Sequence, residues 1–415
     1  MASGSVLVIG GGVVGVCSAH YLSRAGFQVT LLEKGDVCAG SSYGNGGLVV
    51  PSHCIPLAVP GVWLKGLKWM WDPESPFYIK PRLDPKLAAW LWRFRAACTE
   101  AHVRRAVPLL RELSYASLAL FGELAATPGL DFGYRQDGAL GVYRTEPGWE
   151  AAVRDASRLG QAGVATKILD GAGARELEPS LLPGVVGAVL FPDDAHMIPD
   201  RFVRGLARLA ETGGVRVQTD TEVLGFRTRG RRIVAVETTR GDVEADDVVL
   251  AAGSWSPGLG RALGLDLPIQ PAKGYSVTYA RPADGPRIPL MLGEAKAGVT
   301  PMGEMLRFAG TLELAGLDFS INRRRVNAIV RSAGQYVRGV DRLRMLEIWR
   351  GLRPCTPDGL PLLGRSERIE NLVLATGHAM IGVSLGPVTG KLVAQLCARE
   401  EPAIDLALLR PERFS

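Results

Sequence analysis

The sequence lacks long apolar runs, and it lacks the cysteine and histidine spacings that hold metal ions. No segment reaches the roughly 18 consecutive apolar residues that indicate a membrane-spanning helix. The six cysteines form no CxxC pair, and the five histidines form no HxxxH or HExxH pair. We therefore expect no metal site and no disulfide framework, and a reducing, cytoplasmic compartment fits the cysteine usage best.

Charge of one sign is not concentrated either. The chain has 48 Lys and Arg against 42 Asp and Glu, a net charge of +6, and no long basic run. This distribution gives no indication of nucleic-acid binding and supports only a mild attraction to anionic substrates or surfaces. Among the features that are present, 415 residues with 47% hydrophobic content predict a large core and two domains.

The segment SVLVIGGGVVGVCSAHYLSRAGFQVTLLEKG, residues 5–35, predicts a strand, a helix and a second strand. No positively charged stretch precedes its apolar start, so we do not interpret it as a secretory signal. Residues 5–9 have the continuous apolar character of a buried parallel strand. Residues 13–24 have helical periodicity that ends just before Gly26, and residues 27–32 form the next strand.

Three glycines at the first turn of this unit, Gly10, Gly12 and Gly15, form a GxGxxG motif. The first glycine makes the turn, the second lets the backbone approach a pyrophosphate, and the third lets helix and strand pack closely. Glu33 ends the second strand, where a carboxylate accepts hydrogen bonds from ribose hydroxyls. The motif predicts a dinucleotide, but by itself it does not separate NAD from FAD.

Later segments favour FAD. Residues 201–226 predict a helix and a strand, and further strands are expected at 233–238 and at 246–251, which leads into AAGSWS. Residues 371–400 predict a strand, a glycine-rich loop and a helix, with the loop and helix start at Gly382–Gly390 near the nucleotide. We expect these pieces to join the first unit in one sheet. An NAD domain is usually contiguous and needs no such closure.

These segments also carry a family resemblance that covers nearly the whole chain. The sequence resembles the D-amino-acid dehydrogenase branch of the D-amino-acid oxidase and glycine or sarcosine oxidase superfamily of flavoproteins. The matching pieces are VIGGGVVGVCSAHYL, LLEKGDVCAGSSYGNGGLV, PGVWLKGLKWM, DVVLAAGSWS, PAKGYSV, RFAGTLELAG, GLRPCTPDGLPLLG and ATGHAMIGVSLGPVTGKLVAQL. The resemblance implies noncovalent FAD and oxidation of an amino-acid Cα–N bond to an imine, which water hydrolyses.

The implied fold is α/β, α+β overall. It combines a Rossmann-like, discontinuous FAD-binding domain with a substrate domain built on a mainly antiparallel sheet and helices. We expect the FAD domain at 1–80, 150–260 and 346–415 and the substrate domain at 81–149 and 261–345, with 186–200 also able to join the latter.

The resemblance implies FAD contacts from the glycine turn, the end of the second strand, the loop that follows and later strand ends. The resemblance implies that Val223 contacts adenine through its backbone. The positive dipole end of the helix that starts near Ser384 is expected to lie by the flavin and to favour acceptance of hydride. The expected contacts are Gly10, Gly12, Val13, Val14, Gly15, Glu33, Lys34, Ser41, Ser42, Asn45, Gly46, Gly47, Leu48, Val223, Ala252, Gly253, Trp255, Gly377, His378, Ile381, Gly382, Val383 and Ser384.

For the substrate we select Arg353, because a planar guanidinium binds a carboxylate through two parallel hydrogen bonds and the family places its substrate arginine in this segment. Tyr275 and Arg307, from strands of the expected second sheet, are the further candidate catalytic residues, and His53 is a further candidate substrate contact. Hydride transfer needs positioning and electrostatics rather than a strong protein base.

The electron acceptor is left open between two classes. Arg307 stands where the sarcosine-oxidase side of the family tends to have a lysine that promotes reaction with oxygen, which favours a dehydrogenase that uses a quinone or another acceptor. Three alternatives to an FAD-dependent amino-acid dehydrogenase remain. They are a glycine- or sarcosine-type oxidase that uses oxygen, an NAD-linked dehydrogenase, and a noncatalytic FAD-binding subunit.

Five of the eight tryptophans lie between residues 63 and 92. In residues 60–72, PGVWLKGLKWMWD, tryptophan and lysine alternate as they do at membrane interfaces, and Trp90 and Trp92 follow. This segment is expected to cover the mouth of the active site, either as a lid packed on its own domain or in peripheral contact with a membrane.

Overall fold

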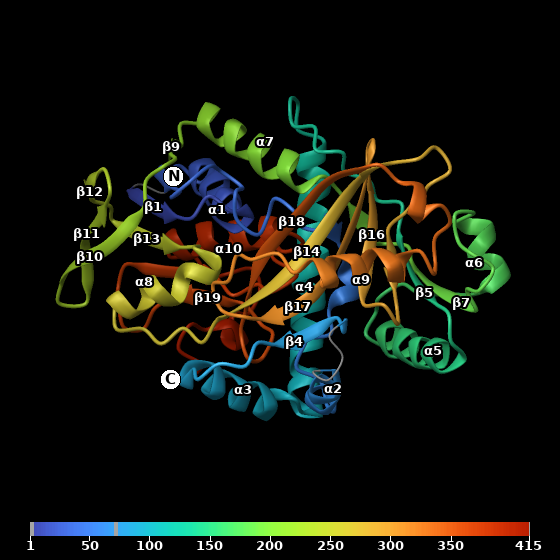
Figure 1. Cartoon of the computed structure of the whole chain (residues 1–415). Coiled ribbons are helices and arrows are strands. Elements are labelled where there is room, and N and C mark those ends of the chain that lie inside the picture. Colours follow the sequence, from blue (N-terminus) through green and yellow to red (C-terminus); the bar gives the residue numbers. More distant parts are fainter. Residues whose placement is uncertain (1–3, 70–73, 415) are drawn as a thin grey trace.

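The computed structural model describes residues 4–69 and 74–414. Figure 1 shows two layered regions: the parallel strands around β1 and β13 at the left, and the long strands β14, β17 and β18 that run from the centre toward β5 and β7 at the right. Helix α4 (Glu100–Ala125) runs beside the junction of the two regions.

In the first region a six-stranded sheet has the order β19-β20-β13-β1-β2-β9. Five strands are parallel and β19 at one edge is antiparallel. The strands are β1 (Ser5–Ile9), β2 (Gln28–Leu32), β9 (Arg216–Gln218), β13 (Asp247–Leu250), β19 (Leu362–Arg365) and β20 (Leu372–Thr376). Three neighbouring strands, β1, β13 and β20, therefore come from distant parts of the chain.

Strand β1 shows why this sheet is buried on both faces. Its side chains alternate, so that Val6 and Val8 enter one hydrophobic cluster while Leu7 and Ile9 enter another. The first cluster also contains residues of α1 (Val13–Arg24), α4, α7 (Pro199–Thr212) and α10 (Gly386–Cys397). The second contains residues of a small sheet, β10 (Val223–Arg229), β11 (Arg232–Thr238) and β12 (Gly241–Val243), packed near α8 (Ser256–Ala262).

The second region is a nine-stranded mixed sheet with the order β18-β14-β17-β16-β15-β5-β7-β6, to which β4 adds by pairing with β17. Most pairs are antiparallel, whereas β15–β5 and β17–β4 are parallel. The strands are β4 (Phe77–Ile79), β5 (Ala139–Tyr143), β6 (Lys167–Asp170), β7 (Gly187–Phe191), β14 (Gln270–Ala280), β15 (Leu290–Leu292), β16 (Ala297–Met302), β17 (Met305–Leu314) and β18 (Met345–Cys355).

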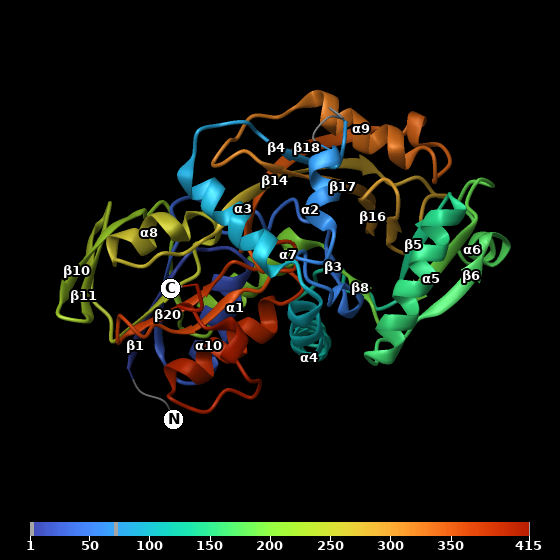
Figure 2. The same ribbon diagram turned by 90° about the horizontal axis from the view of Figure 1, so that it is seen from below.

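Helices cover the mixed sheet. Residues of α9 (Arg323–Ala333) share a hydrophobic cluster with β14, β16 and β17, and Figure 2 shows α9 above these strands. The same view places α5 (Glu146–Gln161) and α6 (Gly171–Leu177) beside β5 and β6, and α2 (Val62–Trp69) and α3 (Pro85–Ala97) on the side toward α4. The short pair β3 (Leu48–Val49) and β8 (Ala195–His196) lies between the regions.

The predicted fold class is confirmed, with one correction inside the FAD domain. The helix expected in 201–226 is present as α7, and the strand expected at 246–251 is β13. The strand at 233–238 does not join the parallel sheet, because β11 pairs only with β10 and β12. The chain after α7 turns away from the parallel sheet after β9, so only three residues of that stretch belong to it.

The expected domain boundaries also differ from the strand pairing. Strand β6 falls within the part of 150–260 expected in the FAD domain, yet it pairs with β7 in the mixed sheet, whereas β7 lies in 186–200, which we expect to be able to join the substrate domain. Strand β4, within 1–80, pairs with β17, and most of β18, within 346–415, pairs with β14. In each case the hydrogen-bonded partner strand, which the sequence does not specify, decides the assignment.

All six cysteines are free. Within residues 4–69 and 74–414, no helix is both long enough and apolar enough to span a bilayer.

Candidate cofactor and substrate site

The three glycines of the first turn have different surroundings. A Cβ on Gly15 would lie 1.8 Å from the Gly10 carbonyl oxygen, so this glycine is required for packing. Gly10 has φ +116 and its Cβ would lie 2.6 Å from Ala251 O. A Cβ on Gly12 would meet only Ser42 Oγ at 3.5 Å, and its φ of −76 suits any residue. The protein itself therefore leaves open space at Gly12, as close approach of a pyrophosphate requires.

Glu33 follows β2 directly and reaches back to the same turn. Its carboxylate accepts hydrogen bonds from the backbone N–H of Gly11 at 2.7 Å and of Gly35 at 3.1 Å. The neighbouring Lys34 places its Nζ 4.0 Å from the centre of the Trp255 ring. Trp255 belongs to the turn after β13, so these contacts join the ends of two strands at one edge of the parallel sheet.

The loop at residues 41–47 lies against this edge. Ser42 Oγ accepts a hydrogen bond from Val13 N at 3.0 Å and so meets one of the N–H groups that a helix start leaves without an intrahelical partner. Arg307 fixes the far side of the loop: its NH1 donates to Tyr43 O at 3.1 Å and to Asn45 O at 3.0 Å, and its Nε donates to Thr278 Oγ1. Burial lowers the pKa of the Arg307 guanidinium.

Arg307 thus connects the backbone of the loop to the Thr278 side chain of β14. This placement makes it a residue that positions the loop.

Strand β18 is held against the parallel sheet through the backbone N–H and C=O of one residue, Leu352. Ser41 Oγ donates to Leu352 O at 2.6 Å and accepts from Leu352 N at 3.1 Å. Ser254 Oγ, in the turn after β13, donates to the same carbonyl at 2.8 Å. The mixed sheet is therefore held against the expected cofactor edge close to Arg353.

The C-terminal glycine-rich loop closes the same edge. Ser384 Oγ accepts a hydrogen bond from Val50 N at 3.1 Å, and His378 Nε2 lies 3.0 Å from Thr389 Oγ1. Burial lowers the pKa of His378 to about 4, so this imidazole is neutral at pH 7. Helix α10 packs on α1 so closely that a Cβ on Gly390 would lie 2.5 Å from the backbone of Cys17.

Arg353 lies on the mixed sheet next to this edge. Its guanidinium passes over Gly274 of β14, where an added Cβ would lie 2.1 Å from its NH1, and NH1 donates to Thr311 O at 2.7 Å. No carboxylate of the described residues lies within ion-pair distance of it. The side chain is partly buried, and burial lowers the pKa of the guanidinium. A partly buried guanidinium without an ion-pair partner is unfavourable, and an anion bound beside it would lower this cost.

The acceptor of the Arg353 hydrogen bond is an unusual residue. Thr311 has φ +64, a left-handed conformation that β-branched residues rarely adopt, and it lies where the register of β14 against β17 shifts between Lys273 and Tyr275. Its Oγ1 is buried and has no hydrogen-bond partner in the structure. At this bulge the strand departs from the regular ladder and offers a carbonyl to the guanidinium.

Tyr275 borders the same cavity, but its phenol belongs to the other face of the sheet. Neighbouring residues of a strand point to opposite faces, and Gly274 is the residue beneath Arg353. The Tyr275 hydroxyl accepts a hydrogen bond from Asn322 N at 3.2 Å, at the start of α9. Burial raises the pKa of this phenol, and the ring packs in the cluster that contains α9.

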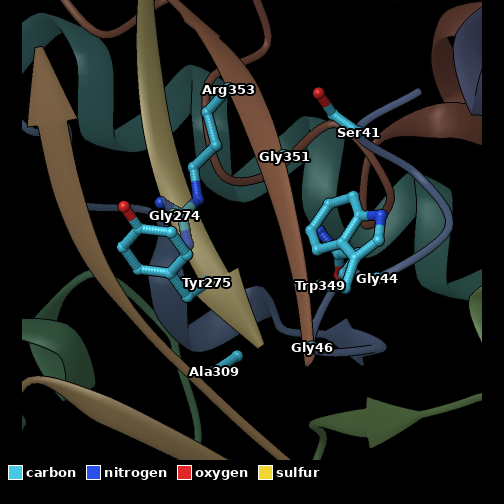
Figure 3. A pocket seen from close by; sticks show the side chains of 10 residues that line it. Ser41, Gly44, Gly46, Gly274, Tyr275, Ala309, Trp349, Gly351 and Arg353 are labelled. Atoms are coloured by element: carbon cyan, nitrogen blue, oxygen red, sulfur yellow. The ribbon is translucent and has the colours of Figure 1, made fainter. Parts of the chain in front are cut away.

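A cavity of about 30 Å³ opens between the sheet and the loop at residues 41–47 (Figure 3). In the view of Figure 3 the Arg353 side chain extends to the left of β18 toward Gly274, and the Trp349 indole lies to the right of the strand beside Gly44. The cavity is lined by Ser41, Gly44, Asn45, Gly46, Gly274, Tyr275, Ala309, Trp349, Gly351 and Arg353. Expected cofactor-loop residues and the expected substrate arginine thus meet at one place.

Two other expected contacts lie apart from this cavity. His53 is exposed, and its Nδ1 lies 3.3 Å from Ser52 Oγ, which donates to Asp194 Oδ2 at 2.6 Å. Burial raises the pKa of the Asp194 carboxyl to about 7. Val223 begins β10 and pairs with Thr238 in the small sheet beside the parallel one.

Sequence reasoning did not select several residues at this cavity, namely Gly44, Gly274, Ala309, Trp349 and Gly351, nor Thr311 beside Arg353. Gly274 lies in the KGYS segment that pointed to Tyr275, Thr311 ends RFAGT, and Trp349 precedes GLRP by two positions. The sequence could have indicated Gly274, which directly precedes Tyr275, and Trp349, which lies two residues before GLRP. The two segments lie on paired strands, β14 and β18. Nothing in the sequence indicates the left-handed backbone of Thr311.

The chain is similar to known proteins over nearly its whole length. The profile of the DAO family, described as FAD dependent oxidoreductase, matches residues 5–396. The chain is 35% identical to D-amino acid dehydrogenase from Agrobacterium fabrum, over 99% of this chain and 100% of the relative. It is 37% identical to D-amino acid dehydrogenase from Methylobacterium radiotolerans, over 98% and 99%. Glycine oxidase from Geobacillus kaustophilus superimposes with a TM-score of 0.80 at 25% identity, over 100% and 99%.

Proposed function

The chain belongs to the DAO family of FAD-dependent oxidoreductases, and from this premise we propose that it oxidises the Cα–N bond of a free amino acid. A D-amino acid is the first substrate class to consider, since relatives 35–37% identical over nearly the full length are named D-amino acid dehydrogenase. An imino acid such as a proline derivative is the second. The imine formed from a primary amine is hydrolysed to a 2-oxo acid and ammonia.

The observation that carries this proposal is the state of Arg353. A partly buried guanidinium with one backbone acceptor and no described carboxylate in ion-pair distance borders a small cavity beside the cofactor loop. A substrate carboxylate supplies the missing anion, and a guanidinium binds it through two parallel hydrogen bonds. Because NH1 is already held by Thr311 O, the planar group is fixed in orientation before substrate arrives.

The reaction itself is balanced by simple bond changes. The Cα–H bond breaks and its electron pair leaves with the hydrogen as hydride, while the neutral amine loses a proton and a C=N bond forms. Bound FAD supplies the two-electron acceptor for that hydride. The chain's part is to bind the carboxylate at Arg353 and to hold Cα at a fixed distance from the cofactor edge.

The residues that would hold FAD are those around the open space at Gly12. We assign the pyrophosphate to the turn at Gly10–Gly15 and the ribose to Glu33, whose carboxylate already lies against that turn. The loop at residues 41–47 and the start of α10 complete the assignment. Among the expected contacts, Val223 lies in the small β10–β11–β12 sheet and Leu48 in the β3–β8 pair, and we retain the assignment of Val223 to adenine through its backbone only.

Anaerobic reduction tests this function directly. The purified holoenzyme is mixed with D-alanine, L-alanine, glycine, sarcosine or D-proline, and the visible absorbance of oxidised flavin is followed. We expect at least one amino acid to bleach the flavin within seconds, with the corresponding 2-oxo acid or cyclic imine as product. A holoenzyme that no amino acid bleaches would support the noncatalytic alternative. A protein that purifies without flavin and binds NADH would support the NAD-linked one.

The electron acceptor is part of the same proposal. We propose a quinone or another acceptor in place of oxygen. Comparing turnover with dissolved oxygen and with a soluble ubiquinone analogue separates the dehydrogenase from a glycine-oxidase type of enzyme. Turnover that is faster with oxygen would favour the oxidase.

We further propose that α2 and α3 contact a membrane where a quinone is reduced. Trp63 and Trp92 are both near the Arg95 guanidinium, at 4.9 and 5.8 Å, and the side chains of Leu64, Leu83 and Trp92 are 59%, 106% and 69% exposed. Such apolar side chains with an adjacent cation suit an anionic bilayer surface. Residues 70–73 and the side chain of Trp69, on which part of this expectation depended, lie outside the described residues.

Replacing Trp92 and Leu83 together with serine should lower the partition coefficient for phosphatidylglycerol vesicles, measured by co-sedimentation, by about 100-fold or more, because each exposed apolar side chain contributes about 1.5–3 kcal/mol when it leaves water. Leu224→Ser provides the control, since Leu224 is 63% exposed on β10. Equal sedimentation of wild type and the double variant would exclude this surface as the membrane contact.

A further inference from the structure

Trp349 and Arg353 lie on the same face of β18 with Gly351 between them. Residues two apart in a strand share a face, and Gly351 pairs with Gly274 of β14 in the register of the mixed sheet. The cross-strand pair of glycines leaves a depression in the sheet. The guanidinium of Arg353 lies over Gly274, and the indole of Trp349 lies over Gly351.

The indole is held by glycines on two sides. A Cβ on Gly351 would lie 2.0 Å from Trp349 Cη2, and a Cβ on Gly44 would lie 2.1 Å from Trp349 Cδ2. The ring of Tyr43 is 6.5 Å from the indole, centre to centre, at an angle of 49°. Gly44 belongs to the cofactor loop and Gly351 to β18, so the indole fills the gap between loop and sheet.

The space that remains next to Arg353 is small. The cavity between these groups measures about 30 Å³. Since a single water needs roughly 10–15 Å³ measured in this way, the cavity has room for about two waters. A ligand whose carboxylate is bound at Arg353 therefore extends toward the indole after few atoms, and its side chain has little space unless the indole is displaced.

We propose that Trp349 is a specificity-determining residue that sets the upper limit on the length of the substrate side chain. The inference rests on the proposed oxidation of amino acids and deepens it. Arg353 selects for the carboxylate common to all amino acids, whereas Trp349 discriminates among them by size. Close packing of the indole against Gly44 and Gly351 opposes its displacement, so the limit is set sterically and does not depend on hydrogen bonding.

The test compares side-chain length profiles. The rate constant of anaerobic flavin reduction divided by the apparent dissociation constant is measured for 2-aminobutyrate, norvaline and norleucine relative to alanine, in the enantiomer that reduces the wild type. Wild type should lose activity with each added methylene. In Trp349→Ala the norleucine-to-alanine ratio should rise by about tenfold or more, the discrimination that one methylene gives in a tight pocket, and Trp349→Phe should lie between.

A second readout does not depend on turnover. Straight-chain carboxylates from acetate to hexanoate bind without reacting, and their affinity is measured from the shift in melting temperature of the holoenzyme. Wild type should favour the short members, and Trp349→Ala should tolerate the long ones. Trp92→Ala is the matched control, since Trp92 is exposed on α3 and its profile should equal that of wild type.

The outcomes are distinct. A ratio within about twofold of wild type in both Trp349 variants, with FAD content retained, would overturn the role of Trp349 and leave the proposed function intact. A wild type that prefers norleucine to alanine would do the same. A wild type whose flavin no amino acid reduces would overturn the proposed function, and this inference with it.

Discussion

Replacing Arg353 with alanine should lower kcat/KM for the best amino-acid substrate by roughly 30-fold to several thousand-fold, because truncating one partner of a buried charge pair costs about 2 to 5 kcal/mol and each ~1.4 kcal/mol is tenfold in rate. FAD content should stay normal, since Arg353 contacts Thr311 O and no residue of the glycine turn. An amine that lacks a carboxylate should react equally with wild type and variant. Arg353→Lys should recover only part of the loss, because a point charge does not reproduce the planar fork.

A second substitution tests the same site while Arg353 itself is retained. Gly274→Ala should displace the guanidinium, because the new Cβ would lie 2.1 Å from its NH1. The matched control is Gly298→Ala on β16 of the same sheet, where the nearest atom is Leu290 O at 3.9 Å. Loss of kcat/KM in Gly274→Ala together with normal kinetics in Gly298→Ala is expected. Normal kinetics in both Gly274→Ala and Arg353→Ala would move the carboxylate site elsewhere.

Gly12→Val should abolish FAD retention while the fold is preserved. Its backbone conformation suits any residue and the protein offers only Ser42 Oγ at 3.5 Å, so the side chain occupies the space assigned to the pyrophosphate. Overpacking of this kind costs about 1–3 kcal/mol or more, which is at least about fivefold in FAD affinity. FAD content after purification and the dissociation constant from reconstitution measure the effect.

Gly15→Val is the contrasting variant. Its Cβ would lie 1.8 Å from Gly10 O, inside the contact of α1 with β1, so it should lower the yield of folded protein as well as FAD content. Melting temperature and far-ultraviolet circular dichroism separate the two cases. If Gly12→Val retained wild-type levels of FAD, the assignment of the pyrophosphate to this turn would be wrong.

The sequence predicts the N-terminal unit well because its signals are local. A continuous apolar run, a helical periodicity and glycines at fixed spacing give β1, α1 and β2 nearly to the residue. The meeting of Ser41, Asn45 and Arg353 at one cavity is also anticipated, although only through the family resemblance.

What the sequence does not specify is pairing and register. Residues 233–238 read as a strand in either sheet, and only hydrogen bonds to β10 and β12 place them outside the parallel one. Tyr275 and Gly274 are adjacent, and a choice between them requires knowing which face of β14 meets Arg353. At Thr311 a bulge in β17 shifts the pairing of this strand with β14, and no residue type in the sequence marks the position. The sequence likewise does not indicate that Arg307 donates to two carbonyls of the cofactor loop, and its role toward the substrate stays a prediction.

The order of strands in the parallel sheet has a consequence for biogenesis. Strand β1 lies between β2, which follows it closely in the chain, and β13, and β13 lies beside β20 at Leu372–Thr376. A ribosome releases the glycine turn early, but β20, which completes this part of the sheet, and α10, which packs on α1, are synthesised long after it. During translation the unpaired edge of β1 or β13 is open to incorrect association, and long-range pairing of this kind is slow. We therefore expect FAD to bind only after β20 and α10 have been made, and free FAD at that point to favour the holo state.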